Sequence, residues 1–268
     1  MLVCSRQLLW GAGGRGTVLE VEMTPQTGLY IRFMCNASEN SPVRVSWGDG
    51  SESFHAFTTS DISTNHTYTA YGRYKIVFEG ARSIGFRNLD GESQYSYDAA
   101  ILSYVDYSGL ITGSRSASFK RAVNLERFIA PNCGWMGQRD FAYCTKLKEV
   151  QIGDNVICYD GTFQYCSALE KFTTINTGIC WSYVWQGCTN LRELRLGAVS
   201  QFATKDFDSC PNLMDVYISD KTVDQIRQVA SSGNITAGYS AKFPWNANSM
   251  CRFHGIDGVI RADGVRLE

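Results

Sequence analysis

The sequence predicts a mainly β protein in which a small N-terminal β-sandwich is followed by a solenoid of 22-residue coils and a closing helix and hairpin. Three observations predict it: alternating apolar runs in the first third of the chain, a fixed repeat period in the second half, and a helix-capping pattern after the last repeat. We expect five segments: an N-terminal segment 1–16, a β-domain 17–85, a degenerate capping coil 86–118, five repeats 119–218 and a C-terminal cap 219–268.

The β-domain is predicted from four apolar runs between Thr17 and about Gly80, which read TVLEVEM, LYIRFMC, VRVSW and YKIVFEG. Turn-rich stretches such as SENSP and GDGS separate these runs. Runs of this length with turns between them have the strand spacing of a small sandwich.

The GDG turn after Trp47 has a structural explanation. Its two glycines permit the positive φ of a tight turn, and Asp49 can cap its own backbone. We place Trp47 and Tyr74 in the core and expect Tyr68 to make a corner hydrogen bond. Calcium is disfavoured, because the one carboxylate near Asp49 is Glu52, whereas calcium takes about six to eight oxygen ligands.

This segment resembles the PKD-type immunoglobulin-like domain, whose hallmarks are a W-x-F-G-D-G-like turn and a later H-T-Y-x-x-x-G-x-Y-x-V strand. The matching residues are Trp47, Gly48, Asp49, Gly50, His66, Thr67, Tyr68, Gly72, Tyr74 and Ile76. The resemblance covers about a quarter of the chain and implies an immunoglobulin-like sandwich. The front motif is shorter than the family pattern, because VSW runs straight into GDG.

The transition at 86–118 is interpreted as a degenerate first coil. Stepping back one full repeat from Phe119 gives Tyr97, then Ala100, and then Ser103 where leucine is expected. A terminal repeat has to cover the apolar columns of its neighbour, so we expect this segment to cap the solenoid.

The repeat unit reads F-x-x-C-x-x-L-x-x-[VFL]-x-[IL] and recurs at its fixed period without a register slip. The aromatic column holds Phe119, Phe141, Phe163, Trp185 and Phe207. The leucine column holds Leu125, Leu147, Leu169, Leu191 and Leu213. The last apolar positions alternate and predict a short strand with one face inward. A single coil cannot bury that face, so the coils are expected to stack in parallel, about 4.8 Å apart, around one continuous core.

The cysteines follow the repeat. Of the ten, one column holds Cys144, Cys166, Cys188 and Cys210, and a second holds Cys158 and Cys180 beside Met136 and Phe202. Since other coils fill these columns with apolar residues, we interpret them as reduced packing thiols rather than disulfides or metal ligands. The sequence leaves Cys4, Cys35, Cys133 and Cys251 unassigned.

One polar column alternates in sign over its first four members. It holds Arg127, Glu149, Lys171, Glu193 and Asp215. Opposite charges on adjacent strands fix the register at modest energy, and we favour this interpretation over a ligand site.

A cap is predicted beyond Ile218, where the repeat ends. Thr222 and Gln225 form a capping-box pattern, and apolar residues continue at helical spacing as far as Val229. The tail MCRFHGIDGVIRADG predicts a hairpin about residues 255–258.

The second half of the chain resembles the BspA-like type of leucine-rich repeat, with the pattern A-F-x-x-C-x-x-L-x-x-[IV]-x-[IL]. The segment from Phe141 to Leu147 follows this pattern closely, and the resemblance covers residues 97–268. It implies surface display, adhesion and binding of host or matrix molecules, in bacteria, some protozoa and their phages, and it does not imply an enzyme. The usual proline after the last strand position is present only as Pro131.

Candidate ligand-binding residues lie on the rims of the coils, where side chains have no packing reason to be large. The six aromatic residues there are Trp135, Tyr143, Tyr159, Tyr165, Trp181 and Tyr183. Tyr143 shares a column with Tyr165, and Tyr159 shares one with Trp181. Stacked aromatic pairs at one-coil spacing would make a flat platform for a sugar ring or a protein anchor. The alternative is that they only shield the edges of the core.

We therefore predict a non-enzymatic, surface-exposed protein that recognises a glycan or protein on another surface, without a cofactor. The alternative is a structural or receptor-binding component of a phage tail or virion, as part of a larger assembly. A carbohydrate-active enzyme ranks last, because the three histidines fit no recognised motif and loop carboxylates such as Asp154 and Asp160 are usually solvated turns.

Composition narrows the partners further. Lys and Arg total 25 against 26 acidic residues with no basic run, which disfavours nucleic acid. No apolar stretch reaches the roughly 18 residues of a membrane span, which disfavours membrane insertion. The first ten residues lack a basic start, so no signal peptide is visible, although an extracellular, bacterial-surface or virion location is expected.

Overall fold

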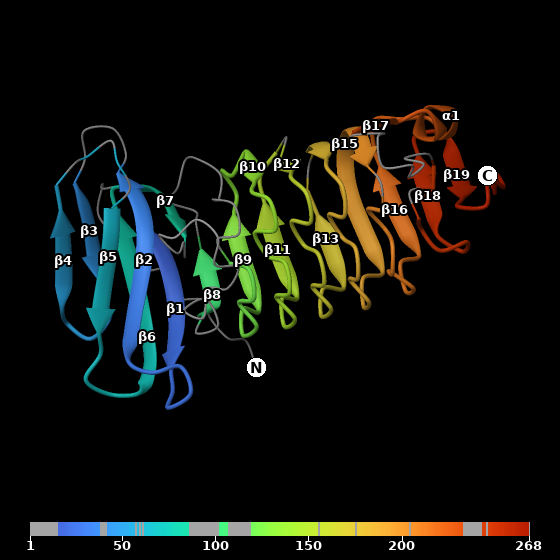
Figure 1. The fold of residues 1–268 in the computed structure, drawn as a ribbon. Coiled ribbons are helices and arrows are strands. Elements are labelled where there is room, and N and C mark those ends of the chain that lie inside the picture. The colour runs from blue at the N-terminus through green and yellow to red at the C-terminus, as the bar shows by residue number, and fades with distance from the viewer. Residues whose placement is uncertain are drawn as a thin grey trace, which may run out of the picture.

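The structure of the chain is a computed structural model. It describes residues 16–37, 42–85, 102–106, 119–232 and 243–267, apart from positions 57, 59, 61, 155, 175, 204 and 245. The predicted fold class is confirmed: a mainly β chain whose strands form a two-sheet N-terminal unit, then a solenoid, then a cap (Figure 1). The segment 1–15, which includes Cys4, lies outside the described residues.

The N-terminal unit is a sandwich of two antiparallel layers. One layer contains β1 (Thr17–Met23), β6 (Gly72–Glu79), β3 (Val43–Ser46) and β4 (Glu52–His55). The other contains β5 (Ile62–Thr67), β2 (Tyr30–Ala37) and β7 (Ala81–Gly85). Phe33 of β2 lies edge-on to Phe78 of β6, with ring centroids 5.3 Å apart, so the two layers share a core.

The GDG turn has the predicted conformation. Gly48 and Gly50 have φ values of 85° and 93°. The Asp49 carboxylate accepts a hydrogen bond from the backbone N–H of Ser51 at 2.9 Å, which caps the turn.

The aromatic residues behind this turn are mostly placed as predicted. Trp47 is fully buried, and the Tyr68 hydroxyl donates to its carbonyl oxygen at 2.9 Å, which confirms the corner hydrogen bond. Tyr74 is only partly buried, because its hydroxyl reaches outward to the carbonyl of Ala70 while its ring stacks on Tyr68.

A single strand, β8 (Leu102–Asp106), joins the sandwich to the solenoid. It pairs antiparallel with β1 on one side and parallel with the first solenoid strand on the other, so one sheet runs through both parts. Val105 pairs with Phe128, an offset longer by one position than the repeat period. The buried residue at the leucine position is therefore Leu102, and the expectation of Ser103 there was wrong.

The error has a simple cause. Paired residues of β8 and β9 are separated by one residue more than the repeat period, so counting back one repeat from β9 gives the residue one position too far along β8. The other two residues expected in the degenerate coil, Tyr97 and Ala100, lie outside the described residues.

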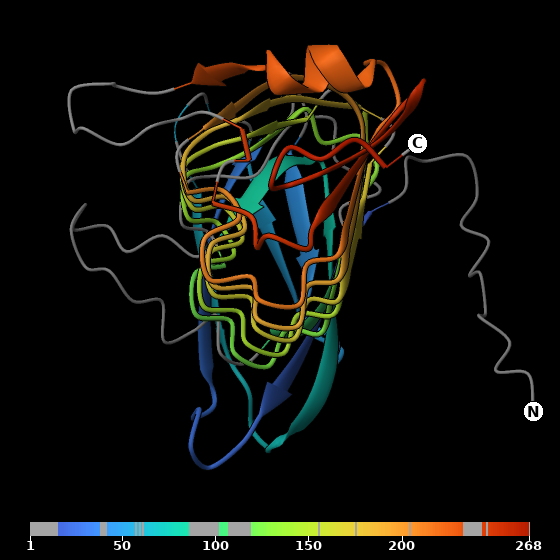
Figure 2. The same ribbon diagram turned by 90° about the vertical axis from the view of Figure 1, so that its right-hand side faces the viewer.

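Each solenoid coil contributes strands to two parallel columns. The first column contains β9 (Arg127–Ala130), β11 (Glu149–Ile152), β13 (Lys171–Thr173), β15 (Glu193–Ala203), β16 (Asp215–Ile218) and β18 (Arg252–Gly255). The second contains β10 (Trp135–Met136), β12 (Ile157–Cys158), β14 (Asn176–Cys180), the end of β15, and β17 (Ala230–Ser232). Viewed along the solenoid axis, the coils lie directly behind one another (Figure 2).

The core of the solenoid is a ladder of aromatic rings. Phe119 and Phe141 stack at 5.3 Å, Phe141 and Phe163 at 5.4 Å, and Trp185 and Phe207 at 5.8 Å. All these side chains and the leucine column are fully buried. The fixed period therefore places like on like, and each ring is covered by its neighbours.

The thiol column packs as predicted and also makes hydrogen bonds. Each thiol donates to the carbonyl oxygen of the column aromatic one coil earlier; these pairs are Cys144 with Phe119, Cys166 with Phe141, Cys188 with Phe163 and Cys210 with Trp185, at 3.0 to 3.1 Å. All nine described cysteines are buried and in the reduced, thiol form. Cysteine suits this column because it is small, apolar and a weak donor.

These thiols are expected to resist thiol reagents in the native state. Burial raises the pKa of Cys210 and of Cys251 to about 12, so almost no reactive thiolate forms at neutral pH. In a Cys4→Ser variant, Ellman's reagent should label no thiol until denaturant unfolds the chain, after which nine should react. Fast labelling of any thiol in the folded variant would contradict this packing.

The cap contains the one helix of the described residues, α1 (Val223–Arg227). Its capping box is present as predicted, with Thr222 and Gln225 each hydrogen-bonded to the backbone of the other. The helix is shorter than predicted, because the chain leaves it at Gln228 and forms β17, which pairs with β15. The predicted hairpin is confirmed as β18 and β19 (Gly258–Arg261).

Candidate functional site

Two columns of the solenoid turns have left-handed backbone. The first contains Arg121, Tyr143, Tyr165, Gly187 and Ser209, with φ values from 58° to 72°. The second contains Arg139, Gly161, Tyr183 and Lys205, with φ values from 55° to 65°. A non-glycine residue in this conformation costs about 1–2 kcal/mol. Three of the six predicted site residues therefore stand where glycine would be easier to accommodate.

The first aromatic ridge consists of Tyr143 and Tyr165 with Arg121 at one end. The tyrosine rings stack with centroids 4.9 Å apart, and each residue is 37% exposed. The Arg121 guanidinium lies 5.6 Å from the centroid of the Tyr143 ring. At the other end the Tyr165 ring lies over Gly187, where a Cβ atom would come within 2.3 Å of it. The missing side chain of Gly187 thus makes room for the last ring.

The second aromatic ridge consists of Trp135, Tyr159 and Trp181. Tyr159 and Trp181 stack at 5.8 Å, and Trp135 meets Tyr159 edge-on at 6.4 Å. All three are between 36% and 38% exposed. Tyr183 is half-buried and makes no ring contact with any other described residue, so the structure brings together five of the six predicted aromatic residues, in two groups.

The stacking changes what the ridges can bind. In each stacked pair the two rings cover one face of each other, so they do not lie side by side as one flat platform. Ring edges carry partial positive charge and Tyr143 and Tyr165 add hydroxyl groups, which suits carbonyl and other acceptor groups of a partner.

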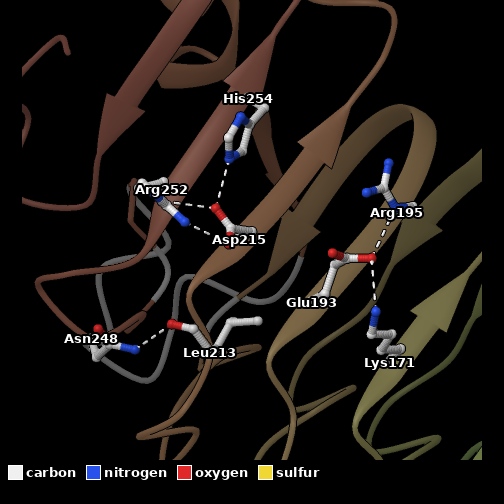
Figure 3. Close-up of polar contacts among 8 residues, drawn as sticks. All are labelled: Lys171, Glu193, Arg195, Leu213, Asp215, Asn248, Arg252 and His254. Carbon is white, nitrogen blue, oxygen red and sulfur yellow. Dashed lines mark hydrogen bonds and ion pairs between the residues drawn. The ribbon is translucent and has the colours of Figure 1, made fainter.

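A third group lies on the outward face of β13, β15, β16 and β18, which we call the strand face (Figure 3). Here Lys171 lies 3.9 Å from Glu193, and at the other end of the column Arg127 lies 3.0 Å from Glu149. These two cross-strand pairs agree with the predicted role of the charge column in fixing register.

Asp215 ends that column and ties the cap to the last repeat. Its carboxylate accepts two hydrogen bonds from Arg252, both at 2.8 Å, and one from His254 at 2.7 Å. Burial acts to raise the pKa of Asp215, but the hydrogen bonds from Arg252 and His254 outweigh it and the pKa is lowered. Both oxygens of Asp215 already accept hydrogen bonds, so this carboxylate has a structural role.

The neighbouring column of the strand face carries a stack that sequence reasoning missed. The Arg195 guanidinium lies 4.1 Å from the centroid of the Tyr217 ring, and that ring stacks on His254 at 4.1 Å and 17°. Arg195 and Tyr217 follow Gln151 and Thr173 in their column, and His254 lies beyond the repeat, so no pattern linked the three. The left-handed columns did have a signal, because Gly161 and Gly187 each stand at a fixed repeat position.

In the sandwich, both oxygens of the Asp49 carboxylate are also engaged in hydrogen bonds. It accepts from Ser51, and its second oxygen lies 2.7 Å from Nε2 of His66, whose ring stacks on Trp47. Burial acts to raise the pKa of Asp49, but the bonds from Ser51 and His66 lower it to about 2. The Asp49 carboxylate therefore stabilises the GDG turn.

Two negative findings on the described residues bear on function. No group of three or more His, Cys, Asp or Glu side chains there is arranged to hold a metal ion. In the same residues, no helix has the length and apolar character required to cross a membrane.

Comparison with known proteins identifies the repeats. Residues 99–236 match the BspA type leucine rich repeat region, in six copies. The chain belongs to this family. The BspA type solenoid suggests a protein-binding or adhesion role, and the family is typically non-catalytic and often found at the cell surface.

Among solved structures, a leucine-rich repeat protein from Bacteroides ovatus is similar at 18% identity with a TM-score of 0.40. The similar part covers 57% of this chain and 36% of that protein, so the chain spans about a third of its length. No curated protein shows a significant sequence match.

Proposed function

We propose that this BspA type repeat protein is a non-enzymatic adhesion protein that holds a protein or glycan of another surface through its two aromatic ridges. The observation that carries the proposal is the left-handed backbone of Tyr143 and Tyr165. Exposed bulky side chains at such positions add conformational cost, and strain of this kind clusters at functional sites. The PKD-like sandwich would serve as a spacer that carries the solenoid away from its attachment.

A protein partner is favoured over a glycan by the geometry of the rings. Sugar recognition by aromatic residues uses open ring faces, and in each ridge a stacked pair, Tyr143 with Tyr165 and Tyr159 with Trp181, covers one face of each of its rings. Aromatic edges and hydroxyl groups instead match the carbonyl-rich surface and small pockets of a protein, in which tyrosine and tryptophan commonly act as anchors.

The test uses substitutions that remove the rings and ease the backbone. In the full chain, Tyr143→Gly combined with Tyr165→Gly should abolish capture on protein and glycan arrays. The melting temperature should stay nearly unchanged, because the relief of left-handed strain offsets the lost ring contact. Ser209→Gly is the matched control, since it makes the same backbone change in the same column without removing a ring.

The second ridge is tested separately with Tyr159→Ala combined with Trp181→Ala. Array binding that survives both double variants, with the fold intact, would remove the ridges as the binding site. Binding lost from only one of them assigns the site to that ridge.

A further inference from the structure

The strand face presents hydrogen-bond donors that its own carboxylates hold in place. Glu193 accepts from Nε of Arg195 at 2.9 Å, and the two terminal nitrogens of Arg195 point away from that carboxylate (Figure 3). On the other side, Tyr217 lies between Arg195 and His254, because the three stand on adjacent strands. The guanidinium is thus fixed in one orientation before any ligand arrives.

The acidic and the basic side chains of the strand face differ in their exposure to solvent. The side chains of Glu193 and Asp215 are 22% and 16% exposed, and both are engaged by neighbouring cations. Those of Arg195 and Arg252 are 48% and 45% exposed. The acids therefore lie beneath the cations, and the surface that a partner meets is made mainly of N–H donors.

We propose that this face binds a carboxylate of an acidic segment of a protein partner, received by the terminal nitrogens of Arg195. A planar guanidinium presents two parallel N–H groups that match the two oxygens of a carboxylate. Arg195 is positioned for this by Glu193 and by the Tyr217 ring against which it packs. The surface is distinct from the aromatic ridges, whose residues lie outside the strands of the first column.

The charge balance favours an acidic peptide over a densely sulfated glycan. The strand face holds three cations, Lys171, Arg195 and Arg252, and each has a carboxylate within 4 Å. A polyanion with closely spaced sulfates would also approach those carboxylates and be repelled by them. One side-chain carboxylate flanked by neutral peptide groups can reach Arg195 without that repulsion.

The experiment is calorimetric titration of the full chain, at low ionic strength, with an acetylated and amidated octapeptide that carries one glutamate among glycine and serine residues. Arg195→Gln should weaken binding by about tenfold, as expected for loss of one charge-assisted pair. Arg195→Lys keeps the positive charge but loses the two parallel N–H groups of the guanidinium, so its affinity should lie between those of the wild-type chain and Arg195→Gln. Arg127→Gln is the matched control: it removes a similarly paired arginine at the far end of the same sheet and should leave the affinity unchanged.

Three results would overturn the proposal: no peptide binding by the wild-type chain at millimolar concentration, equal affinities for wild type and Arg195→Gln, or equal weakening by Arg127→Gln. Tighter binding of a heparin octasaccharide than of the peptide would also reject it, in favour of a sulfated glycan. The double variant of Tyr143 and Tyr165 should bind the peptide normally, so failure of the ridge site and failure of this site are distinguished.

Discussion

Gly153→Ala is expected to destabilise the solenoid by about 3 kcal/mol, because a Cβ atom at this position has no space. The added carbon would lie 2.1 Å from the carbonyl oxygen of Pro131, one coil earlier. The obstacle is backbone, so no side-chain rotation can relieve the contact. The coils would have to separate locally, which would disturb the pairing of β9 with β11.

Gly134→Ala is the matched control. It adds the same methyl group in the same coil-to-coil region, but no atom lies within 4 Å of the new carbon. Its effect should stay within about 0.5 kcal/mol. Urea unfolding of the two variants measures the difference, and equal stabilities would show that the coils do not approach so closely at Gly153.

The same position shows what the sequence could and could not predict. Gly153 stands in the column where the family pattern has proline, and the sequence offered no reason for the exchange. The structure supplies one, since the backbone of Pro131 occupies the space that any side chain would need. Sequence periodicity reports which residues share a column, but it does not report how close two backbones come.

The buried columns were predictable because the positions that recur in every coil are the ones whose side chains are buried. Phe163 and Cys166 recur in type from coil to coil, and both are fully buried. The hydrogen bond from each thiol to the coil below was not predictable, since a small apolar residue would satisfy the same pattern. The register of β8 was missed for a related reason: one extra residue between β8 and β9 shifts every assignment on its N-terminal side by one position.

The candidate sites were also predictable from the sequence only in part. The ridges were predictable as exposed columns of stacked aromatic pairs, but the edge-on contact of Trp135 with Tyr159 depends on side-chain torsions that no spacing encodes. The stack of Arg195, Tyr217 and His254 needs a strand from beyond the repeat to pair with β16. Such a contact follows only from the folded cap.

Phe163→Ala is expected to have the largest effect of any substitution considered, about 3–5 kcal/mol. Phe163 is fully buried in the middle coil, stacked on Phe141 and tilted against Phe172 at 5.2 Å. Removing the ring leaves a cavity that flanking coils cannot fill, because their positions are fixed by parallel backbone pairing on both sides. Chemical denaturation should show the loss directly.

The location of the loss is as informative as its size. Each coil of a solenoid contacts only its neighbours, so Phe163→Ala should increase amide hydrogen exchange most in the coils on either side of it. Phe54→Ala, which removes the same ring from an edge strand where Phe54 is 68% exposed, should leave stability within about 0.5 kcal/mol. Uniform exchange along the whole chain would contradict this and would mean that sandwich, solenoid and cap unfold as one unit through the sheet that β8 makes continuous.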